Sequence, residues 1–215
     1  MSAKPVFITR AAIRSVSQGA CRAALRPLGF HSVSPNFWRA REGELRQAIL
    51  FQTNKYHRPE RGSFTINLGV SVALPPERMG GRPTDPGFAL WPIQQRIGNV
   101  MPARRDIWWE VDTRTDVEAL GLEIARTLLD CAIPFFERYA TSRIFDADPP
   151  EPFGRVHPHS LAVARGGLAA LRGDMEGAAG FFRSAMSGQR SDPLNDRVRR
   201  LSTALAIDLN AGSRP

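Results

Sequence analysis

The chain has 215 residues, of which 42% are hydrophobic, and a formal net charge of +8. This length suits one domain with a filled core and a small appendage. No segment approaches the roughly 18 consecutive apolar residues of a membrane span, and residues 1–10 lack the apolar stretch of a secretory signal. We therefore expect a cytoplasmic protein without a membrane partner, in which Cys21 and Cys131 stay reduced.

The positive charge is concentrated at the N-terminal end. Residues 1–61 hold eleven Lys or Arg against three Asp or Glu, whereas residues 62–215 hold eighteen of each sign. Local positive charge attracts nucleic acid, an acidic protein or a membrane surface. The alternative is a solvated surface shaped by codon bias, because the chain has 27 Arg and only 2 Lys. Charge alone does not decide between these interpretations.

The first half of the chain predicts a helix followed by strands. Apolar residues recur at helical spacing over residues 9–28, and Gly29 is placed to end that helix. Two strands are expected next, over 36–41 and 45–54, joined by a hairpin turn at residues 42–44.

The strand with the clearest pattern is 63–72. Phe64, Ile66, Leu68, Val70 and Val72 alternate with small or polar residues. A period of two predicts an antiparallel sheet with one face against helices and the other face, which includes Thr65 and Asn67, open. The proline- and glycine-rich residues 73–92 predict a long irregular loop.

A short helix or turn is expected over 93–101, and a fourth strand, with the Trp108-Trp109 pair, over 106–111. Asp116 is a suitable N-cap for a helix that reaches about Cys131. Pro134 should break this helix, with one more turn after it. The predicted fold class is therefore α+β, with a four-stranded antiparallel sheet and flanking helices, over residues 1–145.

The C-terminal part predicts a separate helical appendage. Four prolines in 146–158 indicate a linker. A helical hairpin is expected over 159–187, turning at Gly173-Asp174, and a capping helix over 193–209. The appendage, 159–210, carries an apolar surface that needs a partner, so homodimerisation through it is one hypothesis.

Several blocks of sequence resemble the bacterial family named domain of unknown function 4304, over residues 10–140. The blocks are Leu28-Gly29-Phe30, Asn36-Phe37-Trp38-Arg39, 64–70, Arg96-Ile97-Gly98, Met101-Pro102 and 106–110. The resemblance implies no assigned activity; genomic association of some members implies an immunity or toxin-neutralising role.

The hairpin is similar to a single tetratricopeptide repeat. Gly166, Gly173-Asp174, Ala178, Phe182 and Ala185 fall at the small and aromatic positions of that repeat. Arg165 and Ala169 depart from its pattern. The resemblance implies two closely packed antiparallel helices.

Polar and aromatic residues mark a candidate binding surface on the open sheet face and the adjoining loops. Arginine and aromatic residues are enriched at binding hot spots. The alternative is structural: one tryptophan fills the core, the other covers the sheet edge, and Arg96 pairs with Asp106 or Glu110. The candidate residues are Asn54, Lys55, Tyr56, Asn67, Arg96, Arg104, Arg105, Trp108 and Trp109.

Catalytic, metal and cofactor motifs are missing from the sequence. His157-Pro158-His159 gives no fixed set of metal ligands, and neither cysteine has a histidine at a helical neighbour position. Gly80-Gly81 and Gly166-Gly167 lack the context of a phosphate-binding loop. We therefore expect no cofactor and no metal.

These observations favour a non-enzymatic module that recognises another protein. Nucleic-acid binding, with Trp38 and Tyr56 stacking on bases, is the first alternative. The second is a small-molecule enzyme that uses Asp106, Glu110 and Arg96 around a pocket.

Overall fold

The computed structural model describes residues 8–41, 45–56, 58–72, 91–146, 155–156, 158–187 and 192–209. The predicted turn at 42–44, most of the predicted 73–92 loop, and residues 147–154 and 157 of the predicted linker lie outside the described residues. The chain divides into two compact units. The first comprises residues 1–39, 47–69 and 95–138; the second comprises 40–46, 70–94 and 139–215. Every helix in the described part of the chain is too short or too polar to span a membrane.

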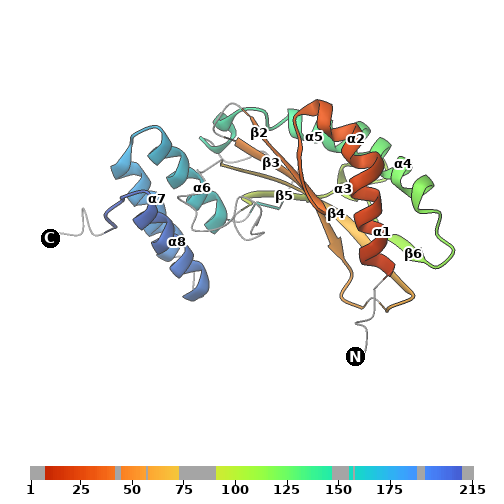
Figure 1. Ribbon diagram of the computed structural model, residues 1–215. Coiled ribbons are helices and arrows are strands. Elements are labelled where there is room, and N and C mark those ends of the chain that lie inside the picture. Colours follow the sequence, from red (N-terminus) through yellow and green to blue (C-terminus); the bar gives the residue numbers. More distant parts are fainter. Residues whose placement is uncertain are drawn as a thin grey trace. The chain divides into compact units, whose positions relative to one another are not determined.

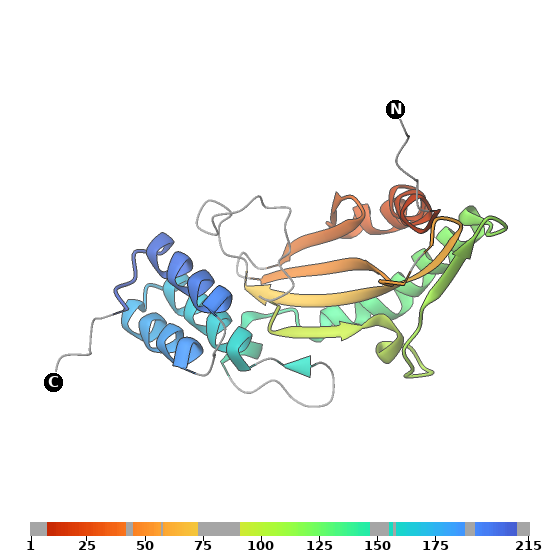
Figure 2. The ribbon, with the colours of Figure 1, turned by 90° about the horizontal axis from the view of Figure 1, so that it is seen from below.

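The α+β class and the antiparallel sheet are confirmed, but the predicted count of four strands is wrong. The described residues form seven strands in the order β1-β2-β3-β4-β5-β7, with β6 paired to β4 outside that path (Figure 1 and Figure 2). The three unexpected strands have two to four residues, too few to show a period of two. The strands are β1 (His31–Val33), β2 (Asn36–Arg41), β3 (Leu45–Thr53), β4 (Arg61–Val72), β5 (Ile93–Arg96), β6 (Trp109–Asp112) and β7 (Arg155–Val156).

The open face expected along β4 is not present at its centre. Thr65 and Asn67 are only 0% and 6% exposed. β4 is an interior strand between β3 and β5, and the Asn67 side chain donates to Gln52 Oε1 at 2.9 Å. This polar face reaches solvent toward the ends of β4, where Arg61 is exposed and Ser71 is partly exposed.

The helix predicted over 9–28 is present but interrupted. It consists of α1 (Ile8–Val16), a π-helical turn η1 (Ser17–Cys21), α2 (Arg22–Leu25) and a 3-10 turn η2 (Arg26–Leu28). Gly19 has non-helical dihedral angles, φ −86° and ψ −115°. Gly29 ends the segment in the left-handed region with φ 80°, as expected for a C-cap glycine.

The second predicted helix begins as expected at its N-cap, where Asp116 Oδ1 accepts hydrogen bonds from the Glu118 and Ala119 amides, each at 3.0 Å. The helix runs through α4 (Val117–Thr127), a π-helical turn η5 (Leu128–Ala132) and α5 (Ile133–Glu137). A short helix, α3 (Ile97–Val100), comes earlier in the chain, between β5 and β6. The break predicted at Pro134 is wrong, because η5 continues directly into α5, in which Pro134 is the second residue. Gly121 lies where α4 contacts the first helix, and an added Cβ would fit there at an ordinary contact distance, 3.6 Å from Ala20 Cβ.

A buried arginine joins strands and helices of the first unit. Arg39, 4% exposed, donates to Gln47 Oε1 at 2.8 Å, to the Leu28 carbonyl at 3.0 Å and to Glu137 Oε1 at 3.0 Å. Its guanidinium lies 4.6 Å from the ring centroid of Phe30. Burying this charge is tolerable because its donors have acceptors.

The second unit contains the predicted helical hairpin. It has η6 (Ser142–Phe145), α6 (Pro158–Leu171), α7 (Met175–Ser187) and α8 (Asp192–Ala204), and the three α-helices lie side by side (Figure 1 and Figure 2). Gly173 turns the chain with φ 85°. Gly166 allows α6 and α7 to approach, because an added Cβ would lie 2.6 Å from the Phe182 ring. The likeness to a tetratricopeptide repeat, and the domain division at 146–158, remain predictions.

Candidate functional site

The exposed end of the polar sheet face forms a groove in the first unit. In the β4–β6 pair, Arg61 lies opposite Asp112 and Ser63 opposite Glu110, so these four side chains share one face. Asn54 extends the face beyond β3, because its amide N donates to the Ser63 carbonyl at 2.9 Å and its side chain to Ser63 Oγ at 3.3 Å.

Alternation along β6 explains why this face is polar. Trp109 and Val111 point into the core, and Glu110 and Asp112 point outward. Trp109 is anchored there, because its ring stacks on Phe64 with centroids 5.8 Å apart.

The groove has a cavity volume of about 470 Å³ and mixes both charges with an aromatic ring. We call it the β6 groove; it is lined by Tyr56, Arg61, Gly62, Ser63, Glu110, Val111, Asp112 and Thr115. Tyr56 is 77% exposed, the largest exposed fraction among the big apolar side chains of the described chain. Lys55 Nζ lies 4.8 Å from the centroid of that ring.

Two charges of the β6 groove have no partner among the residues that the structure describes. Neither Arg61 nor Glu110 makes a side-chain hydrogen bond or ion pair there. They are diagonal neighbours across the β4–β6 pair, and no hydrogen bond or ion pair joins their side chains. Each is therefore available to a group from outside the chain.

Asp112 is instead held by the turn that follows β6. Its Oδ1 accepts hydrogen bonds from the Arg114 amide at 2.8 Å and from Thr115 Oγ1 at 3.1 Å. The hydrogen bond from the Arg114 backbone is the largest cause that lowers the pKa of this carboxyl below 3.8, followed by the Thr115 hydroxyl. Asp112 thus keeps its negative charge and fixes one end of the groove.

A second group of predicted residues forms what we call the Trp108 cluster, made of Arg96, Asp106 and Trp108. Asp106 Oδ2 accepts from both Arg96 Nη1 and Trp108 Nε1, the latter at 3.0 Å. The Arg96 guanidinium lies 5.0 Å from the Trp108 ring centroid. The hydrogen bond from Arg96 is the main cause that lowers the pKa of Asp106. The pairing of Arg96 with Asp106, one of the two expected alternatives, is confirmed.

The remaining predicted site residues do not join either group. Asn67 is buried, and Trp109, 8% exposed, donates its indole N–H to Glu123 Oε1 at 2.9 Å on the helix side of the sheet. Arg104 and Arg105 are exposed in the loop before β6, where Arg104 has an unusual positive φ of 44°. Trp109 therefore fills the core, as the structural alternative holds for one of the two tryptophans.

Of the predicted binding residues, Tyr56 lines the groove and Asn54 and Lys55 lie beside it, but the prediction missed Arg61, Ser63 and Asp112. Alternation along β4 could have found two of them, because Arg61 and Ser63 lie on the same face as Thr65 and Asn67, at the end nearest the loop. The pairing of β6 with that end of β4 has no local signal.

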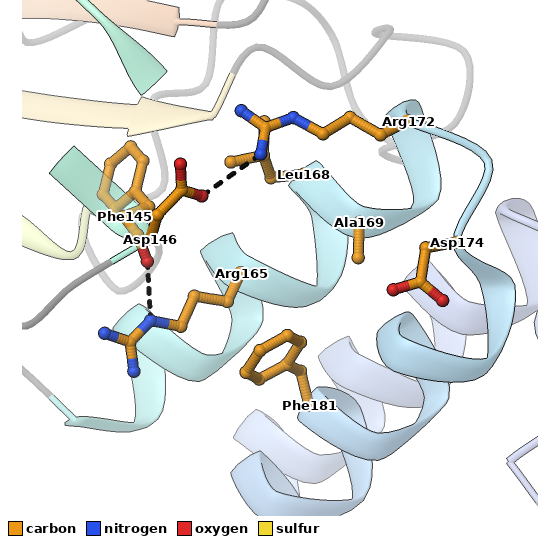
Figure 3. A pocket seen from close by; sticks show the side chains of 8 residues that line it. All are labelled: Phe145, Asp146, Arg165, Leu168, Ala169, Arg172, Asp174 and Phe181. Atoms are coloured by element: carbon orange, nitrogen blue, oxygen red, sulfur yellow. Dashed lines mark hydrogen bonds and ion pairs between the residues drawn. The ribbon is translucent and has the colours of Figure 1, made fainter. Parts of the chain in front are cut away.

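The second unit has its own cavity, of about 600 Å³, between η6, α6 and α7 (Figure 3). Its polar groups are already engaged within the unit. Arg165 Nε donates to the Phe145 carbonyl at 2.7 Å, and Arg172 pairs with Asp146 at 3.1 Å, as Figure 3 shows. Asp174 accepts from the Gly177 amide at 2.8 Å at the start of α7. The arginine contacts join α6 to η6 and the Asp174 contact caps α7, so these groups are already engaged and the β6 groove is the better candidate site.

Thiol and metal chemistry find little support among the described residues. Burial raises the pKa of Cys21 to about 12, and it also raises that of Cys131, so both thiols stay protonated. No group of three metal-ligating side chains occurs in the described part of the chain. His159 instead contacts the Ala185 carbonyl through Nδ1 at 2.7 Å, and His157 lies outside the described residues.

The first unit is therefore an α+β domain with a polar groove at one end of its sheet, where β6 pairs with β4. Residues 21–138 match the family described as domain of unknown function (DUF4304), and the chain belongs to this family. No match was found among curated proteins or among solved structures.

Proposed function

We propose that the chain is a non-enzymatic module that binds another protein through the β6 groove and the Trp108 cluster. The observation that carries the proposal is that Arg61 and Glu110, beside the exposed ring of Tyr56, have no partner among the residues that the structure describes. A partner that supplies opposite charges gains these contacts without first breaking ion pairs within this chain. Tyrosine, tryptophan and arginine are also the side chains that dominate binding energies at protein interfaces.

The geometry of the Trp108 cluster supports the same proposal. One carboxylate oxygen of Asp106 holds both the Arg96 guanidinium and the Trp108 indole N–H. Side chains that are already ordered lose less conformational entropy when a partner binds. The cluster is partly exposed, with 33% of the Arg96 side chain accessible, so a partner can reach it.

The electrostatics favour a protein partner over the two alternatives. Nucleic acid would meet Glu110 and Asp112 in the groove, and these carboxylates repel phosphates. For an enzyme, a carboxyl group that exchanges protons near neutral pH needs a raised pKa, whereas those of Asp106 and Asp112 are lowered. The proposal includes an immunity role, in which the bound protein would be a toxin. This part rests only on the genomic association of some members of the family.

The test uses matched variants of the whole chain. Proteins from the native cell are captured on the wild type after nuclease treatment, the bound protein is identified and purified, and its affinity is measured by calorimetry. Because Arg61 and Tyr56 lie in the groove, Arg61→Gln and Tyr56→Ala should each weaken binding by about tenfold or more.

The controls make the same chemical changes on α4, where Arg126 and Leu122 are exposed. Arg126→Gln and Leu122→Ala should leave the affinity within about twofold, as surface changes away from an interface do. Capture that disappears after nuclease treatment would assign the groove to nucleic acid and overturn the proposal. Equal affinities for groove and control variants would also overturn it.

A further inference from the structure

β6 has an open edge at Glu110. The Asn54 amide donates to the Ser63 carbonyl, so the main-chain groups of Ser63 point toward β3. In an antiparallel pair, a residue whose groups point away from its partner strand faces one that does the same. Glu110 lies opposite Ser63, and its N–H and C=O therefore point away from β4. In the described chain, no strand pairs with β6 on that side.

The next rung of the same edge is closed. The Asp112 amide donates to Thr115 Oγ1 at 2.9 Å, and the Asp112 carbonyl accepts from the Thr115 amide at 3.3 Å. This turn confirms the alternation, because Asp112 has the same parity as Glu110. It also limits an added strand to the edge that begins at Glu110 and continues away from Asp112.

We propose that the partner adds an extended segment to this edge as an antiparallel strand, with a Lys or Arg side chain beside Glu110. The inference rests on the proposed function and names the chemistry of the partner. Main-chain hydrogen bonds to an open edge supply affinity, and side chains at alternate positions supply selectivity. A cation directly opposite Glu110 is favourable, whereas an acidic side chain there is repelled.

The same charges argue against a second copy of this chain as the occupant. Two β6 strands paired with each other would bring Glu110 and Asp112 of one copy against those of the other. Like charges in adjacent strands are destabilising, and charged residues on edge strands are a common protection against self-pairing. A basic segment removes this repulsion and leaves the main-chain contacts intact.

The test uses the full chain and capped eight-residue peptides that alternate Lys with Thr or Glu with Thr. Binding is followed through the backbone amide signals of the protein in nuclear magnetic resonance spectra. The Lys peptide should shift the Glu110 and Val111 amides and bind about fivefold more tightly than the Glu peptide. This preference should vanish in Glu110→Gln and persist in Glu118→Gln, which changes an exposed glutamate on α4.

N-methylated peptides separate strand addition from simple charge attraction. In an antiparallel rung, the residue opposite Glu110 gives its own N–H to the edge. Methylation of the Lys amides should therefore abolish binding, and methylation of the Thr amides should preserve it. Equal binding of the two methylated peptides, or equal binding of the Lys and Glu peptides, would overturn the inference. If the peptides fail while Arg61→Gln still weakens partner binding, strand addition is wrong and the proposed function stands.

Discussion

Replacement of Arg39 by methionine tests how the first unit is held together. Methionine preserves the length of the side chain but removes its donors. The Gln47 side chain is fully buried, and loss of the 2.8 Å bond leaves its Oε1 without this donor. An unsatisfied buried acceptor costs about 1–3 kcal/mol, and the bond to the partly buried Leu28 carbonyl adds about 1 kcal/mol.

The loss of the Glu137 ion pair adds little, since 47% of that side chain is exposed and water can solvate it. The free energy of unfolding should therefore fall by about 2–4 kcal/mol. Urea unfolding followed by circular dichroism measures it, with Arg126→Met on exposed α4 as the control, expected within about 0.5 kcal/mol of wild type. A loss for Arg39→Met below about 1 kcal/mol would refute the reasoning about the buried acceptor.

Three further predictions concern single residues. Thr65 Oγ1 is buried without a hydrogen-bond partner among the described residues, so Thr65→Val should raise the free energy of unfolding by about 1 kcal/mol in urea unfolding; a lower value would contradict it. Gly98→Ala should lower it by about 2 kcal/mol or more, because the new Cβ would lie 2.2 Å from the Arg105 carbonyl; an unchanged midpoint would contradict this. The lowered pKa of Asp106 stabilises the fold above the carboxyl's unfolded value, and this contribution is lost as pH falls through the folded value. The Trp108 indole N–H resonance should therefore shift with a midpoint below pH 3.8, and Asp106→Asn should abolish the shift.

The sequence predicted those parts of the fold that depend on local pattern. The alternation over 63–72 became β4, Asp116 became the N-cap of α4, and Gly29 became a left-handed C-cap. Each of these features depends on residues close in the chain. The π-helical turns at 17–21 and 128–132 were not predicted, because apolar spacing scarcely changes when a helix gains one residue.

The sequence did not predict how far the polar face of β4 is buried or how β4 pairs with β6. Alternation gave Thr65 and Asn67 a polar face, but it could not tell that this face is closed at the centre of β4 and accessible only toward its ends, near Arg61 and in part at Ser71. The groove depends on the pairing of Ser63 with Glu110, which lie 47 residues apart. Such pairings follow from tertiary packing rather than from local propensity. The sequence predicts for Glu110 only side-chain roles, an ion pair with Arg96 or an acid in an enzyme, whereas its open main-chain edge follows from the β3–β4–β6 register.

Hydrogen exchange on the complex with the captured partner tests the central claim most directly. Slower exchange is expected at Tyr56, residues 61–63, residues 110–112 and Thr115, which line the β6 groove, with the Glu110 amide among the most protected. The exposed face of α4 should exchange at its free rate. Protection confined to α6 and α7, with the groove unchanged, would contradict the account and move the binding surface to the second unit.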